Sequence, residues 1–280
     1  APTPAGASVP GAVRLPRPRQ PGGVPALQDR GACGGEVMRE LHLFAGAGGG
    51  ILGGMLLGHT CVCAVELEPY CRDVLLQRQR DGILPRFPIW DDVRTFDGKP
   101  WRGRVDVVCG GFPCTDVSHF GSRSERLGLD GERSGLWHHM ARIVEEVGPA
   151  LVFIENTPQI RYRGLDVIVR DLASLGYDCA WDVFSAREVG APHERKRLWC
   201  LAWHTDGAHA RAVVTVPRKD AEPVGTCWWT KERESRIPRM DDGVADRLDR
   251  FRAVGNGQLP AVVVRAWRML MPLDAGPGIE

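Results

Sequence analysis

The sequence predicts an α/β fold in which a mostly parallel sheet carries helices on both faces. Short apolar runs typical of buried strands recur between residues 40 and 203, and helical stretches separate them. This alternation is the usual pattern of parallel sheets. The hydrophobic fraction of 43% and the charged fraction of 25% are those of an ordinary globular protein. Because no apolar run approaches the roughly 20 residues that span a bilayer, the sequence excludes a transmembrane protein.

The first half of this pattern begins with a short apolar run at 40–46 that ends in a glycine turn. A Gly-rich turn and helix follow at 47–57, and a second apolar run at 61–66 ends in an acid. Residues 69–79 have a helical pattern. The apolar run at 104–109 predicts a third strand, which leads into two glycines.

The second half repeats the alternation and then weakens. The expected elements are a helix at 137–147, a strand at 150–155, a helix at 164–175, and strands at 179–184 and 197–203. Residues 204–243 contain few apolar runs. Helices are expected again at 244–253 and 260–271, on either side of the turn Gly255-Asn256-Gly257.

These patterns divide the chain into four parts. Residues 1–37 hold 7 Gly and 7 Pro with no aromatic residue, so they bury too little surface to offset the ordering entropy, and we expect a disordered leader. Residues 38–203 form the expected catalytic and cofactor-binding domain. Residues 204–250 form a small lobe, and residues 251–280 return to the catalytic domain.

Composition also limits the setting and the partners. Nine cysteines, an odd number, exclude a complete set of disulfides within the chain, and several lie in apolar runs, which indicates reduced thiols in an intracellular setting. Cys61 and Cys63 lack a second half-site, so we expect no metal. A net charge of +1 excludes a polycationic protein but not a local basic groove.

Polar groups gather where the expected strands end. Parallel sheets bind ligands at the carboxyl ends of their strands. Glu66 stands at one such end, where an acid can accept hydrogen bonds from ribose hydroxyls. Cys114 follows two glycines in a loop whose N–H groups favour a thiolate. Glu155 ends an apolar run, which favours its protonated form. A thiolate beside a carboxylic acid suits attack on a heteroaromatic ring.

Five blocks in order carry a family resemblance. They are Leu43-Phe44-Ala45-Gly46-Ala47-Gly48-Gly49, Gly111-Phe112-Pro113-Cys114, Glu155-Asn156, His193-Glu194-Arg195-Lys196-Arg197 and Gly255-Asn256-Gly257-Gln258-Leu259-Pro260. In these blocks the sequence resembles the DNA cytosine-5-methyltransferases, over residues 40–270. The resemblance implies the Rossmann-like fold of S-adenosylmethionine-dependent methyltransferases, with a small target-recognition lobe.

The resemblance also implies a cofactor site and a catalytic site. S-adenosylmethionine is expected to lie against Phe44, Ala47, Gly48, Gly49, Glu66, Asp92, Val93, Pro113, Leu136 and Asn256. Glu66 is expected to hold the ribose and Asp92 the adenine amino group. Cys114 is expected to attack C6 of a flipped-out cytosine while Glu155 bonds the ring. Arg197 is expected to reach the cytosine O2, and Arg195 to orient Glu155.

Double-stranded DNA is the expected substrate. The loop at 115–136 is expected to close over it, with basic side chains on the phosphates. The recognition region is short, which suggests a short target. The expected DNA-binding residues are Arg123, Arg126, Arg133, Trp228 and Trp229. We expect a cytoplasmic, nucleoid-associated monomer that does not bind membranes and has a restriction endonuclease as a potential partner.

Four other functions agree less well with these motifs. A tRNA cytosine-5-methyltransferase of the same fold typically has Pro-Pro-Cys where this chain has Phe112-Pro113-Cys114. An amino-methyltransferase uses a different motif without cysteine. A nicotinamide-dependent oxidoreductase does not explain Cys114, Glu155 and Arg197 together. A silent DNA-binding homologue would have no need of both Cys114 and Glu155.

Overall fold

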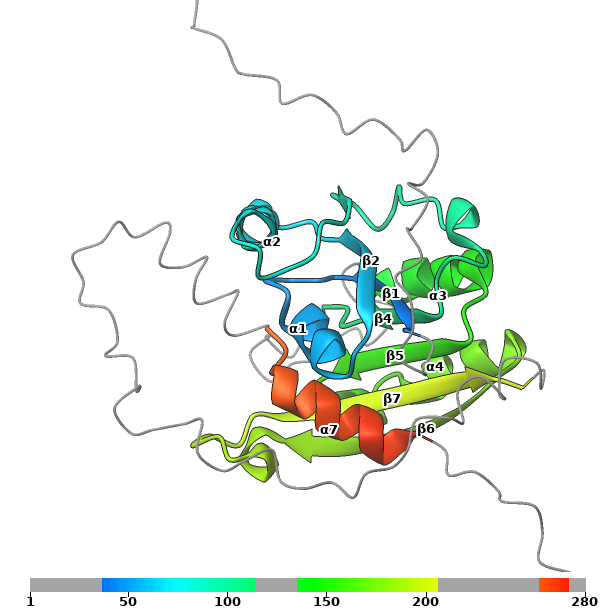
Figure 1. The fold of residues 1–280 in the computed structure, drawn as a ribbon. Helices are drawn as coiled ribbons and strands as arrows, with labels where there is room; N and C mark the ends of the chain where they lie inside the picture. Colours follow the sequence, from blue (N-terminus) through cyan, green and yellow to red (C-terminus); the bar gives the residue numbers. More distant parts are fainter. Residues whose placement is uncertain (1–36, 114–134, 206–256, 272–280) are drawn as a thin grey trace, which may run out of the picture. The chain divides into compact units, whose positions relative to one another are not determined.

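The structure, a computed structural model, describes residues 37–113, 135–205 and 257–271, all within one compact unit at 32–280. In these ranges seven strands form one sheet in the order β3-β2-β1-β4-β5-β7-β6 (Figure 1). The strands are β1 (Arg39–Leu43), β2 (Thr60–Val65), β3 (Ile89–Trp90), β4 (Val107–Gly110), β5 (Leu151–Asn156), β6 (Tyr177–Ser185) and β7 (Lys196–His204). The first five strands are parallel, and β7 runs antiparallel to β5 and β6. The predicted mostly parallel α/β fold is confirmed.

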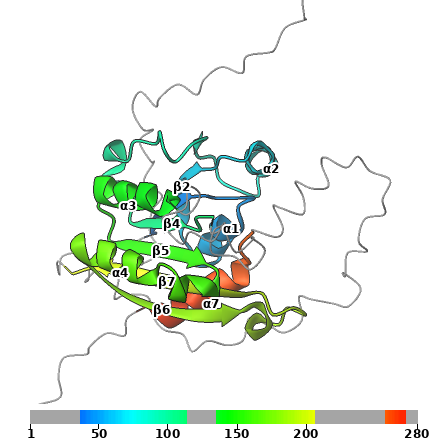
Figure 2. The same ribbon diagram turned by 180° about the vertical axis from the view of Figure 1, so that it is seen from behind.

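Helices cover both faces of this sheet, as predicted. The helices α1 and α7 lie on one face, and α3 and α4 lie on the other (Figures 1 and 2). The described helices are α1 (Gly49–Leu56), α2 (Pro69–Arg80), α3 (Leu136–Val147), α4 (Leu165–Ser174) and α7 (Pro260–Leu270), with 3₁₀ turns at Lys99–Trp101, Pro158–Tyr162 and Ala186–Val189. None of these helices is long and apolar enough to cross a membrane.

The core beneath α7 follows from the alternation of side chains along the strands. Phe153 of β5 and Trp199 of β7 point to the α7 face and stack, with ring centroids 4.9 Å apart. Trp267 of α7 meets Phe153 edge to face at 5.2 Å. Glu155 lies two residues after Phe153, and Arg197 lies two residues before Trp199 in the antiparallel strand. Both therefore lie on this same face, at the sheet edge.

Strand registers align the functional ends. Leu43 of β1 lies opposite both Val65 of β2 and Gly110 of β4, and Gly110 lies opposite Ile154 of β5. The residue that follows each of these four positions therefore stands in one row. The row consists of Phe44, Glu66, Gly111 and Glu155. The predicted convergence at the carboxyl edge is confirmed.

Some elements differ from the expectation, and others lie outside the described residues. The two-residue strand β3 and the 3₁₀ turns were not predicted, because such short pieces carry too few residues to show a period. The expected helix at 244–253 lies outside the described residues. So do nearly all of the expected leader at 1–37 and lobe at 204–250, and these divisions stay predictions.

Candidate active site

The loop after β1 turns the chain sharply toward α1. Phe44 has φ of 55°, Gly46 has 54° and Gly48 has 89°, all in the left-handed region. For Phe44 this conformation is strained, and such strain concentrates at ligand sites. A Cβ on Gly46 would meet no atom within 4 Å, so the backbone here faces open space. Ala47 and Gly49 belong to the same turn.

Glu66 ties the ends of β1 and β2 together. Its Oε2 accepts a hydrogen bond of 2.6 Å from the N–H of Gly46, and its Oε1 accepts one of 2.8 Å from the N–H of Glu68. Burial raises the pKa of this carboxyl, and the two N–H donors work against that shift. The structure thus places the predicted ribose-binding acid directly beside the glycine loop.

The expected adenine contacts lie after β3. The carboxylate of Asp92 pairs with Arg94 at 2.7 Å, and the hydrogen bond from that guanidinium is the main reason why the pKa of Asp92 is lowered. Val93 is buried, and its carbonyl accepts a hydrogen bond of 3.0 Å from Arg142 of α3. Leu136 is half-buried at the start of α3.

An ion pair between a buried glutamate and a half-buried arginine lies at the end of β5. The Nε of Arg197 lies 2.9 Å from Oε1 of Glu155, and Glu155 is 8% exposed. Burial raises the pKa of Glu155, while Arg197, Arg195 and the side-chain amide of Gln258 oppose the shift. The predicted desolvation of Glu155 is confirmed. Its carboxyl has a ready hydrogen-bond donor in Arg197 and sits where a substrate would approach the sheet edge.

The two arginines act on Glu155 in different ways. Arg197 forms an ion pair with this carboxyl, and the expected contact of Arg197 with the cytosine stays a prediction. Arg195 donates a hydrogen bond of 2.6 Å to the carbonyl of Gly257 and acts on Glu155 through its charge. The reason is the strand period: Arg197 lies in β7, which pairs with β5, whereas Arg195 precedes the strand with φ of 23°.

The loop after β4 is anchored as far as it is described. The amide of Asn156 donates a hydrogen bond of 3.2 Å to the carbonyl of Phe112, which holds this loop against β5. Pro113 is exposed at the edge. The next residue, Cys114, lies outside the described residues. The other expected site residues that lie outside them are Arg123, Arg126, Arg133, Trp228, Trp229 and Asn256.

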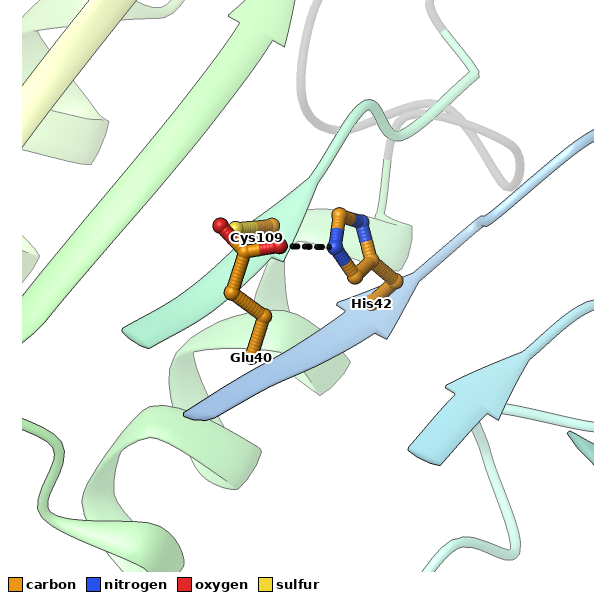
Figure 3. A group of neighbouring side chains, drawn as sticks. All are labelled: Glu40, His42 and Cys109. Carbon is orange, nitrogen blue, oxygen red and sulfur yellow. Dashed lines mark hydrogen bonds and ion pairs between the residues drawn. The ribbon is translucent and has the colours of Figure 1, made fainter. Parts of the chain in front are cut away.

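A buried polar cluster that the sequence did not predict lies on the α7 face of the sheet, and Figure 3 shows three of its side chains. His42 donates a hydrogen bond of 2.8 Å to one oxygen of the Glu40 carboxylate, and His59 donates one of 2.7 Å to the other. Cys109 of β4 lies beside them. The potential metal-ligand atoms of Glu40, His42 and Cys109 all lie within 4.8 Å of one another. Since each carboxylate oxygen already has an imidazole partner, we interpret the cluster as a hydrogen-bonded network. Alternation along the run at 40–46 was the available signal.

This cluster makes a prediction about stability. Burial alone would raise the pKa of Glu40, but His42 and His59 outweigh it and lower the pKa to about 2. Because the folded pKa lies below the ordinary value of 4.5, the carboxyl stabilises the fold fully above pH 4.5. This contribution, about 3 kcal/mol, is lost as the pH falls toward 2. We expect Glu40→Gln to weaken that pH dependence, as measured by urea unfolding between pH 3 and 7. If the free energy of unfolding depended on pH as in wild type, this would contradict the pairing of Glu40 with His42 and His59.

The fold and the site together define the class of the protein. A parallel sheet with one reversed strand, a glycine loop after β1 and an acid after β2 is the architecture of the S-adenosylmethionine-dependent methyltransferases. The chain belongs to the family of C-5 cytosine-specific DNA methylases, whose family model matches residues 38–240. The expected family is confirmed.

Individual relatives agree with this assignment. The Type II methyltransferase M.CviJI of Paramecium bursaria Chlorella virus IL3A is 34% identical over 179 residues, covering 64% of this chain and 46% of the relative. The Type II methyltransferase M2.BsuMI of Bacillus subtilis is 32% identical over 173 residues, covering 59% and 42%. This chain thus spans less than half the length of these two relatives. The Entamoeba histolytica methyltransferase EhMeth is similar in fold, with TM-score 0.50 and 16% identity, covering 61% of this chain and 54% of that one.

Proposed function

We propose that this chain transfers a methyl group from S-adenosylmethionine to C5 of a cytosine in double-stranded DNA. The observation that carries the proposal is the ion pair between the buried Glu155 and Arg197. It stands at the end of β5, next to the β4 loop that leads into Cys114 and in one row with the glycine loop and Glu66. The family membership makes cytosine C5 the reacting atom to test.

The residues present fit the cofactor. The open space at Gly46 lets a ligand approach the backbone, and Glu66 supplies a buried carboxylate at the end of the next strand. We assign the cofactor to this loop, Glu66, Asp92, Val93, Pro113, Leu136 and Asn256. When bound there, S-adenosylmethionine supplies an electrophilic methyl group. Arg94 donates hydrogen bonds to both oxygens of Asp92, so an adenine amino group bound there would share these oxygens with Arg94.

The protein groups act on the flipped-out base. The cytosine must leave the duplex, because its C5 and C6 edge is not reachable within the stack. The Cys114 thiolate attacks C6 and forms a C–S bond, which makes C5 nucleophilic. Glu155 hydrogen-bonds N3 and the exocyclic amine and stabilises the charge that develops on the ring. After methylation, loss of the C5 proton returns the electron pair that expels Cys114.

The proposal also includes the DNA-binding residues and the cellular setting. Arg123, Arg126 and Arg133 are assigned to DNA phosphates, and Trp228 and Trp229 to the target bases. The enzyme is proposed to act as a monomer in the cytoplasm, at the nucleoid, with a restriction endonuclease as its cellular partner. Two of the relatives named above are Type II methyltransferases, which supports a restriction endonuclease as the partner.

A trapping experiment tests the reaction. The protein is incubated with labelled S-adenosylmethionine and duplex DNA containing 5-fluorocytosine, whose fluorine cannot leave as the C5 proton does. A stable protein–DNA adduct that carries the label is expected. A parallel arm uses 5-fluorocytosine tRNA. Labelling of tRNA alone would replace DNA by tRNA as the substrate, and methyl transfer to ordinary DNA without an adduct from the fluorinated DNA would refute the covalent step.

A further inference from the structure

Gln258 occupies a space that three glycines leave open. This residue lies two positions before α7, between Gly257 and the N-cap residue Leu259. A Cβ on Gly49 would collide with its backbone carbonyl, and a Cβ on Gly50 would collide with its Oε1. A Cβ on Gly111 would lie 3.0 Å from its Nε2. One glutamine thus contacts both the first turn of α1, where the glycine loop ends, and the loop after β4.

The side-chain amide of Gln258 reaches the carboxyl of Glu155. The amide acts on this carboxyl as a hydrogen-bond donor and lowers its pKa, and since a carboxylate only accepts, the amide nitrogen is the donor. A Cβ on Gly111 would lie 2.7 Å from Oε2 of Glu155 and 3.0 Å from Nε2 of Gln258, so the two atoms border the same small space. The other oxygen, Oε1, accepts from Arg197 at 2.9 Å. Two donors therefore hold the carboxyl.

The backbone of Gln258 is held in place on both sides. On one side, Arg195 donates a hydrogen bond of 2.6 Å to the carbonyl of Gly257. On the other, the carbonyl of Leu259 accepts from the N–H groups of Val262 and Val263 and so fixes the first turn of α7. Val263 in turn packs against Gly53 of α1, the helix that follows the glycine loop. Gln258 is thereby locked relative to that loop.

We propose that Gln258 is a positioning residue that fixes the carboxyl of Glu155 and joins it to the glycine loop after β1. The inference rests on the proposed function for its catalytic consequence. The amide and Arg197 together set the plane of the carboxyl, so that its free edge faces the flipped-out base. The alternative is that Gln258 only fills space, in which case its polar atoms have no effect of their own.

Two substitutions of nearly the same size separate these readings. Gln258→Met keeps an unbranched side chain but has no donor. We expect kcat to fall about 10- to 100-fold, the effect of one hydrogen bond to a charged group, with the KM for DNA changed less than about twofold. Because a donor favours the charged carboxyl, its loss raises the pKa of Glu155, and the limb of the pH–rate profile that Glu155 sets moves to higher pH.

Gln258→Glu supplies the sharper comparison. The new carboxyl can donate only when it is protonated, so methyl transfer should recover as the pH is lowered, and Gln258→Met should show no such recovery. Gln77→Met, an exposed glutamine on α2, is the matched control and should behave as wild type. Thermal melting verifies that each variant is folded.

A measurement without turnover keeps this inference separate from the proposed function. The ¹³C carboxyl resonance of Glu155, followed against pH, should titrate at higher pH in Gln258→Met than in wild type, whether or not the protein methylates DNA. An unchanged titration, or a folded Gln258→Glu variant without recovery at low pH, would overturn the positioning role. If wild type forms no adduct with 5-fluorocytosine DNA while the titration shifts as expected, the proposed function fails and the contact stands.

Discussion

A Cys114→Ser variant is expected to lose methyl transfer by at least about a thousandfold, because a serine hydroxyl is not ionised at neutral pH and is a far weaker nucleophile than a thiolate. Binding of S-adenosylmethionine should stay within about twofold of wild type, since the substitution replaces one atom and touches none of the proposed cofactor contacts. Transfer of label to duplex DNA measures the first quantity, and calorimetry measures the second.

The matched control for this substitution is Cys179→Ser. Cys179 lies near the start of β6, opposite Ala202, whereas the site lies toward the other end, where Phe184 faces Arg197. It receives the same change from thiol to hydroxyl and should leave transfer unchanged. Substantial transfer by Cys114→Ser, with a 5-fluorocytosine adduct still formed, would mean that another group attacks C6.

A Glu155→Gln variant is expected to lower kcat about 100- to 10,000-fold, the range of a general acid–base group, with little change in cofactor affinity. The amide has nearly the same shape but carries neither the charge nor the ionisable proton of the carboxyl. It also leaves the guanidinium of Arg197 without its counter-ion. Single-turnover transfer measures the chemical step, and Glu145→Gln, an exposed acid on α3, is the control.

The pH dependence of methyl transfer provides a second test of the Glu155→Gln variant. Burial raises the pKa of Glu155, so the folded protein keeps this carboxyl protonated to higher pH than an exposed glutamate. If the protonated form assists the attack, wild-type transfer falls as the pH rises through that raised pKa. Glu155→Gln should lack this limb. A variant that keeps both the rate and the limb would assign the limb to a different group and remove Glu155 from the proposed mechanism.

Local pattern was enough for much of the site. Glu66 and Glu155 each end an apolar run, and apolar runs of that length become buried strands. Because parallel strands end at one edge, the row of Phe44, Glu66, Gly111 and Glu155 could be anticipated without coordinates. Burial of Glu155 followed from the same run.

Other contacts depended on pairing between distant segments. The strand β7 inserts between β5 and β6 and runs antiparallel, which no local period reveals. That insertion sets Arg197 near the end of β5, where it forms the ion pair with Glu155. Glu40 and His42 lie on β1 and His59 lies just before β2, so their hydrogen bonds appear only once β1 and β2 are paired.

The sequence by itself determined the α/β class, the order of buried strands along the chain and the acids at their carboxyl ends, because hydrophobic periodicity is a local property. Only the tertiary structure decided that Arg197 pairs with Glu155 and that Gln258 fits among Gly49, Gly50 and Gly111. These contacts join residues far apart in the chain. They depend on strand direction, on register and on the free space where a Cβ is missing, and each of these exists only after the sheet has formed.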